Sequence, residues 1–276
     1  MNYDEFADEM IREVEHLMKP EVKVKKHCAS KNNGAKKVAL VIVRKDVNIS
    51  PTIYLEEFYE QYQQGISVSK LAKCILDFYE NVCVKTSVDV ERIFIYDNIK
   101  DKIAYRVINK EKNKEMLESI PHKEILDLAI VYYLLLDDQE LGTATVTINK
   151  EHLKYWGITE QDLFERARIN TEKILPSSKM CLTDVMYVHT NESGYLGAAV
   201  ILYSDVLKKE YERLGENFYI IPSSIHEIIV VPESFGMNRI EMENMLRSIN
   251  ASDVREEEIL SDYVYYYMGK EERIIL

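Results

Sequence analysis

Residues 22–44 read VKVKKHCASKNNGAKKVALVIVR, and this stretch decides the fold class. Two segments rich in strand-forming residues, 22–29 and 37–44, flank a polar turn that contains Asn33-Gly34. Asn-Gly is a preferred pair for tight turns between antiparallel strands. The apolar run 38–43 is continuous, so we expect its strand to be covered on both faces. The stretch therefore predicts an antiparallel β-hairpin.

The same pattern of strands joined by short turns recurs along the chain. Short turns favour antiparallel pairing, so the predicted class is α+β, with antiparallel β-hairpins alternating with helices. The order of hairpin and then helix at 126–174 and again at 185–214 predicts an internal pseudo-repeat. Apolar spacing predicts helices over 3–18, 54–64, 68–82, 110–117, 150–156, 160–174, 205–214 and 238–249. Strands are expected at 103–108, 126–136, 143–148, 185–190, 195–202, 218–222, 227–231, 263–267 and 273–276.

The composition is that of an ordinary globular protein, with 46% hydrophobic and 30% charged residues in a chain of 276. A change of charge and pattern predicts two domains: 1–87, with a helix, a basic hairpin and two further helices, and 88–276, an α+β domain. No apolar run approaches the roughly 20 residues that span a bilayer. The acidic N-terminus lacks the features of a signal peptide. We therefore expect no membrane contact and a cytoplasmic location.

Positive charge is concentrated in the predicted hairpin. The chain carries a net charge of −12, yet residues 21–45 carry +7, which leaves −19 on the rest. Such a basic hairpin can contact a polyanion or nucleic acid through its lysines, or it can be a solvated surface. No Phe, Tyr or Trp lies in this segment, so the contact would be weak and independent of base sequence. The lysines proposed to bind are Lys25, Lys26, Lys36 and Lys37.

One short segment combines a nucleophile, a base and a carboxylate: Ser223, Ser224, His226 and Glu227. Serine hydrolysis requires a base within hydrogen-bond reach of the hydroxyl and a carboxylate that orients the base. On a strand, however, His226 and Glu227 point to opposite faces. Serine and histidine in a tight turn also commonly bond the local backbone. The segment is therefore a candidate catalytic site. The alternative is that its side chains only stabilise the local backbone of the turn.

Metal and cofactor motifs are missing from the sequence. No glycines have the spacing of a phosphate loop or a dinucleotide fold, and the H-E-x-x-H zinc pattern is absent. The four cysteines, Cys28, Cys74, Cys83 and Cys181, have no paired spacing, so we expect buried reduced thiols. No metal site and no cofactor are predicted.

Tyrosine is abundant, with 19 residues, and several lie in the last predicted hairpin. Tyr265 and Tyr267 share one face of that strand. Tyrosine suits both half-buried strands and partner surfaces. These two side chains are therefore candidates for partner binding, with core packing as the alternative.

Several sequence segments resemble those of a known family: 48–56, 120–122, 126–133, 175–176 and 221–227. The residues in these segments resemble domain-of-unknown-function family 5688 of clostridial and other Firmicute bacteria. The region 148–160 with Asn170 more distantly resembles the uncharacterised YtpQ-like family. Neither resemblance implies a reaction or assigns a role to any residue.

Three functional hypotheses follow. The first is a non-catalytic binding or protein-interaction module, based on the missing catalytic motifs, the uneven charge and the tyrosine-rich strands. The second is a hydrolase of unrecognised class centred on 222–227. The third is a nucleic-acid-associated protein that uses the basic hairpin 21–45.

Overall fold

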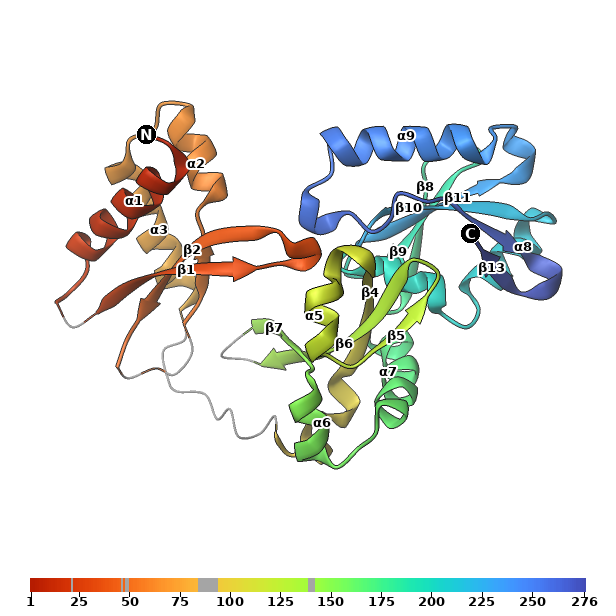
Figure 1. Cartoon of the computed structure of the whole chain (residues 1–276), viewed down its shortest axis with the longest axis horizontal. Helices are drawn as coiled ribbons and strands as arrows, with labels where there is room; N and C mark the ends of the chain where they lie inside the picture. The colour runs from red at the N-terminus through yellow and green to blue at the C-terminus, as the bar shows by residue number, and fades with distance from the viewer. Residues whose placement is uncertain (21, 46, 48–49, 84–93, 139–141) are drawn as a thin grey trace. The chain divides into compact units, whose positions relative to one another are not determined.

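The computed structural model describes residues 1–20, 22–45, 47, 50–83, 94–138 and 142–276. The chain divides into two compact units, which are treated separately here: 1–90 with 138–142, and 91–137 with 143–276 (Figure 1). The domain boundary expected between residues 87 and 88 lies outside the described residues. Helices and antiparallel sheets make up both units, so the predicted α+β class is confirmed.

The first unit contains the predicted hairpin. Strands β1 (Lys23–Ser30) and β2 (Lys36–Val43) pair antiparallel, and β3 (Thr52–Tyr54) pairs with β2. The turn between β1 and β2 contains Asn33 and Gly34 at positive φ, 61° and 72°. These are conformations that asparagine and glycine tolerate best, so the local sequence specifies the turn.

Three helices accompany this sheet: α1 (Tyr3–Leu17), α2 (Glu56–Gln63) and α3 (Val68–Val82). The apolar face of α1 supplies Phe6 and Met10 to a core that also contains Leu40 and Ile42 of β2. The opposite face of β2 is less covered, since Val41 is only half-buried. The expectation that β2 is covered on both faces therefore holds only in part.

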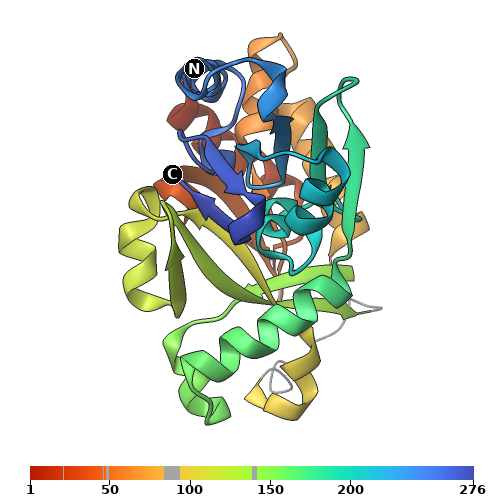
Figure 2. The same cartoon turned by 90° about the vertical axis from the view of Figure 1, so that its right-hand side faces the viewer.

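The second unit contains a smaller sheet of order β4-β6-β5, with β7 paired to β6. Helix α7 packs along β4, and Thr171 of α7 accepts a hydrogen bond from the backbone N–H of Tyr105 at 2.9 Å (Figure 2). The strands are β4 (Ile103–Asn109), β5 (His122–Ile125), β6 (Leu128–Asp138) and β7 (Gly142–Thr147). The helices are α4 (Tyr96–Ile99), α5 (Lys114–Ser119), α6 (Lys150–Trp156) and α7 (Glu160–Ile174).

The same unit contains a six-stranded sheet of order β13-β12-β10-β11-β9-β8, so β8 lies at one edge. Its strands are β8 (Ser177–Cys181), β9 (Tyr187–Asn191), β10 (Phe218–Ser224), β11 (Glu227–Pro232), β12 (Tyr265–Met268) and β13 (Arg273–Ile275). Two helices accompany it, α8 (Val206–Leu214) and α9 (Arg239–Ser252). A large core shared by both sheets includes Tyr105, Phe218 and Tyr265.

One predicted hairpin does not form. The segment expected as a strand at 195–202 is a 3₁₀ helix over Gly197–Leu202, and β9 pairs with β8 and β11 instead. Gly197 packs so closely that a Cβ there would stand 2.0 Å from Thr190 Oγ1 and 2.5 Å from the His226 carbonyl oxygen. This close approach and the left-handed Leu196 (φ 55°) turn the chain out of the strand conformation. The second hairpin of the expected pseudo-repeat therefore does not form, and this prediction is wrong.

The cysteines are also placed differently from expectation. Cys28, Cys74 and Cys181 are exposed and Cys83 is half-buried, with all four thiols free. Cys28 lies on β1 and Cys181 lies on β8, and both are edge strands of their sheets. A small side chain on an edge strand can remain exposed. The prediction of buried thiols is wrong.

Among the described helices, none is both long enough and apolar enough to cross a membrane.

Candidate functional site

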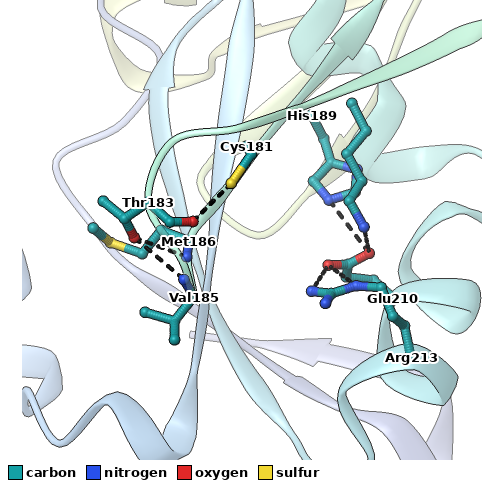
Figure 3. A network of polar contacts seen from close by, with 8 residues as sticks. Cys181, Thr183, Val185, Met186, His189, Glu210 and Arg213 are labelled. Atoms are coloured by element: carbon teal, nitrogen blue, oxygen red, sulfur yellow. Dashed lines mark hydrogen bonds and ion pairs between the residues drawn. The ribbon is translucent and has the colours of Figure 1, made fainter.

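The candidate site is built around Glu210, which projects from helix α8 toward the paired strands β8 and β9. Only 4% of its side chain is exposed, although glutamate is rarely buried without partners. Lys179 Nζ lies 2.9 Å from Oε2, and Arg213 Nε donates to Oε1 at 3.0 Å. His189 Nε2 lies 3.7 Å from Oε2, beyond hydrogen-bond length (Figure 3). We call these four residues the Glu210 cluster.

Three elements bring the Glu210 cluster together. The register of β8 and β9 places Lys179 opposite His189, so both side chains project from the same face of the sheet. Arg213 follows Glu210 by three residues on α8 and therefore lies on the same side of the helix. The Tyr187 ring contacts both cations, with its centroid 4.3 Å from Lys179 Nζ and 4.0 Å from Arg213 Cζ. The aromatic face thus supports both cations.

The electrostatics of the cluster keep Glu210 ionised. Burial acts to raise the pKa of Glu210, because a buried carboxylate loses hydration. The neighbouring His189, Arg213 and Lys179 outweigh burial and hold the pKa of Glu210 well below its ordinary value. A carboxylate held in this way is a poor proton donor or acceptor near neutral pH. The cluster is suited to positioning cations rather than to acid–base chemistry.

A cavity of about 450 Å³ opens beside the cluster. At its wall, His189 Nε2 is buried and makes no hydrogen bond to any described residue. It has Glu210 as an ionic neighbour at 3.7 Å and keeps its hydrogen-bonding capacity beside the cavity. The residues lining the cavity come from α7, β8, β9, α8 and the loop before α8: Glu172, Pro176, Ser177, Ser178, Lys179, His189, Tyr203, Asp205, Val206, Lys209, Glu210 and Arg213.

Strand β8 forms both a wall of this cavity and the edge of the sheet. Its residues are mostly exposed, and β9 is its strand partner among the described residues. Exposed apolar side chains follow along the hairpin at Met180, Leu182 and Val185, with 54%, 52% and 42% exposure. An exposed edge strand with apolar side chains is a template for pairing with another chain.

The predicted catalytic segment spans the end of β10, a two-residue turn and the start of β11, and only His226 of the four candidates lies in the turn itself. Ser223 Oγ donates to Glu227 at 3.1 Å, so these two residues meet. Ser224 Oγ accepts from the backbone N–H of His226 at 3.0 Å. The hydroxyl of Ser224 therefore bonds the backbone of His226.

The imidazole of His226 has partners of its own. Its Nδ1 accepts a hydrogen bond from the backbone N–H of Leu196 at 3.1 Å, and Nε2 lies 3.8 Å from Glu258. Its ring stands 5.3 Å from that of Tyr195. The structure thus brings together residues 196, 226 and 258, which are distant in sequence.

The predicted binding lysines are divided between the two faces of the hairpin. Lys26 and Lys36 lie on the same face as the core residues Leu40 and Ile42, which is the face that the helices cover. There Lys26 Nζ bonds Asp8 of α1 at 2.7 Å. Lys25 and Lys37 lie on the opposite face. The four side chains do not form a single surface.

The two tyrosines proposed to bind a partner are in the core. Tyr265 and Tyr267 have 0% and 4% exposure. The Tyr265 hydroxyl donates to Asp127 at 2.6 Å, and the Tyr267 ring stacks on Phe218 at 5.0 Å. In this structure neither ring is at the surface.

The Glu210 cluster was missed by sequence reasoning. Glu210 stands among charged residues in LKKEYERL, which reads as an ordinary solvated helix. The polar Ser177-Ser178-Lys179 segment does not have the pattern of a strand. One signal was available: the i, i+3 spacing of Glu210 and Arg213 predicts an ion pair, though not its burial.

The fold and the site together define an α+β protein with a buried, cation-paired carboxylate beside an open sheet edge. The model of the family of unknown function DUF5688 matches residues 3–186 and 177–268. These matches cover most of the chain, so the chain belongs to this family, as the sequence resemblance predicted. Comparisons with curated proteins and with solved structures find no match.

Proposed function

We propose that this protein is a non-catalytic protein-interaction module that binds an extended segment of a partner protein along the free edge of β8. The observation that carries the proposal is the exposed edge of β8 next to the cavity at the Glu210 cluster. Addition of a strand to a sheet edge derives affinity from main-chain hydrogen bonds and specificity from pockets for alternate side chains. Both features occur here side by side.

The hydrogen bonds of the hairpin indicate which backbone groups are available. At its two ends, Glu192 N donates to Pro176 O and Leu182 N donates to Met186 O, each at 2.9 Å. Residues bonded to the partner strand alternate with residues whose backbone points the other way. The N–H and C=O groups of Ser177, Lys179 and Cys181 therefore point toward the free edge. An added strand would pair with them.

The cavity supplies the second element of recognition. Because Lys179 is fixed on Glu210, its ammonium presents remaining donors toward the cavity that His189 also lines. Ser177 and Ser178 add hydroxyl groups. A side chain with an acceptor oxygen, such as Asp, Glu or Asn, fits this set of donors. We expect the partner segment to place such a residue here.

The chemistry of the polar clusters supports binding rather than catalysis. Glu210 is held ionised by cations. Ser224 and His226 engage the backbone of the turn and of Leu196. The hydrolase hypothesis requires a hydroxyl–imidazole hydrogen bond, and within the described residues no bond of this kind joins Ser224 to His226. The hydrolase hypothesis therefore remains an alternative that no hydrogen bond between the Ser224 hydroxyl and the His226 imidazole supports.

The experiment uses a displayed library of random linear peptides as the probe. Peptides selected on the wild-type protein are tested on two variants at one edge position. Cys181→Pro removes an outward N–H without removing a bond to β9, whereas Cys181→Ser is the matched control that retains the N–H. We expect Cys181→Pro to weaken binding by about tenfold, the effect of losing one hydrogen bond of about 1.4 kcal/mol.

Hydrogen exchange supplies an independent readout. The bound peptide should protect the amides of Ser177, Lys179 and Cys181, while amides in β10 and β11 keep their exchange rates. Equal affinity of the peptides for Cys181→Pro and Cys181→Ser, with protection elsewhere, would contradict the proposal.

A second candidate function, weak nucleic-acid contact, rests on the basic hairpin. Its support is the face of the sheet opposite the helices, where Lys23 and Lys25 share a side with His27. Because Lys26 is engaged by Asp8, fewer lysines are available than the sequence suggests. We therefore expect salt-sensitive binding without base preference.

A further inference from the structure

Arg106 lies in the middle of β4, and the other residues of that strand are buried. Its Nε atom is buried and makes no hydrogen bond to any described residue. Its guanidinium carbon lies 6.0 Å from the centroid of the Tyr133 ring. A partly buried arginine is therefore built into the sheet, with its Nε atom removed from water.

The neighbours of Arg106 are uncharged hydrogen-bonding groups. Arg106 pairs with Val131, and Tyr133 pairs with Ala104, so both side chains project from one face of the sheet. Burial lowers the pKa of Arg106, and the nearby Tyr195 and Tyr133 act in the opposite direction. Burial raises the pKa of Tyr133 to about 12, so its hydroxyl remains protonated at neutral pH. The neutral hydroxyl of Tyr133 does not balance the charge of the guanidinium.

Five other arginines of this unit form ion pairs with carboxylates: Arg166, Arg168, Arg213, Arg239 and Arg247. Arg166 lies 3.7 Å from Asp101, and Arg239 lies 2.9 Å from Glu243. Arg106 forms no ion pair with any carboxylate of the described residues. A buried charge without a counter-charge lowers stability, and an apolar residue of similar size would pack here without that penalty. The charge of Arg106 is therefore not balanced by a carboxylate of the described residues.

We propose that Arg106 binds an oxyanion, a carboxylate or a phosphate group, beside the hydroxyls of Tyr133 and Tyr195. Guanidinium groups bind both oxyanions through two parallel N–H donors, and tyrosine hydroxyls can donate to the same oxygens. Arg106 is itself only partly buried and Tyr195 is 55% exposed, so both side chains reach the surface. This site is separate from the edge of β8 and does not depend on the function proposed there.

The test uses inorganic phosphate and acetate as probes, with potassium chloride at equal ionic strength as the reference. Either anion that binds should raise the melting temperature of the wild-type protein by about 3 °C at ten times its dissociation constant, relative to chloride. The two arms distinguish a phosphate site from a carboxylate site. In NMR spectra, the Nε–H signal of Arg106 should shift along the titration that produces the thermal effect.

Two variants separate binding from structure. Arg106→Met should remove the anion effect and raise the melting temperature in chloride, because it removes an unpaired buried charge. Arg166→Met is the matched control, since it removes the same charge from an exposed ion pair in the same unit and should keep the anion effect. Arg106→Lys retains the charge without the paired donors, and should bind at least about tenfold more weakly.

Three results would overturn the inference. One is a wild-type melting temperature and Arg106 Nε–H signal that respond equally to phosphate, acetate and chloride. Another is an anion effect that Arg106→Met retains. The last is equal affinity of the wild-type protein and Arg106→Lys for the anion, because the paired guanidinium donors would then play no part. If Arg106→Met does not fold, the wild-type titration and Arg106→Lys decide the question.

Discussion

Two histidine–carboxylate pairs in the larger unit have nearly the same separation and very different surroundings. His189 Nε2 lies 3.7 Å from Glu210, with side chains 5% and 4% exposed. His226 Nε2 lies 3.8 Å from Glu258, with side chains 24% and 33% exposed. Because water screens the second pair, distance alone does not decide what such a pair does. Burial and additional cations decide it.

The sharpest test of this comparison is the pair of variants Glu210→Gln and Glu258→Gln. Loss of the Glu210 charge leaves Lys179 and Arg213 without their counter-ion, so we expect a loss of about 2–4 kcal/mol of unfolding free energy. We expect Glu258→Gln to change it by less than about 0.5 kcal/mol. Urea denaturation of both variants measures the difference. An equal loss of unfolding free energy in the two variants would contradict the proposed difference between the two pairs.

Acid sensitivity is the second test. The folded-state pKa of Glu210 is depressed, so the folded protein binds this proton more weakly than the unfolded chain. Its contribution to stability is complete above the ordinary value of 4.5 and falls as the pH drops below it. The wild-type protein should lose stability relative to Glu210→Gln between pH 5 and pH 3, by roughly 1–2 kcal/mol. If the stabilities of the wild-type protein and Glu210→Gln changed with pH in the same way, this expectation would be contradicted.

The turn that contains His226 supplies a third, smaller effect. Ser224→Ala removes the acceptor for the His226 N–H, and His226→Ala removes the acceptor for the Leu196 N–H. Each should lower stability by about 1 kcal/mol and leave the binding of selected peptides unchanged. If His226→Ala abolishes an activity while the melting temperature stays constant, the hydrolase hypothesis takes first place.

The smallest effect extends the comparison to two adjacent lysines. Lys25→Glu and Lys26→Glu change the charge equally on opposite faces of β1. Lys25→Glu should weaken low-salt nucleic-acid binding without a change in stability. Lys26→Glu should instead lower stability by about 0.5–1 kcal/mol, because it faces Asp8 and Asp4. Anisotropy titrations and melting curves separate the two. Tight binding that survives high salt would make nucleic-acid recognition the primary function.

Local sequence determined much of the secondary structure. The helices Val68–Val82, Lys150–Trp156 and Glu160–Ile174 have the predicted bounds. Thr159 and Asp162, three residues apart, form a reciprocal cap at the start of α7. The Asn33-Gly34 turn has the positive φ angles that these residues favour. Periodicity, caps and turn residues act over a few neighbours, so the sequence by itself specifies them.

Tertiary structure decided the features that matter for function. Lys179, His189 and Glu210 meet only because β8 pairs with β9 and α8 packs beside them. Nothing in the local pattern predicts that Glu210 is buried or that Arg106 lacks a counter-charge. Burial and electrostatic pairing depend on contacts between residues far apart in the chain. The sequence therefore determined the elements, and packing decided which of their charges were paired, buried or left open to a partner.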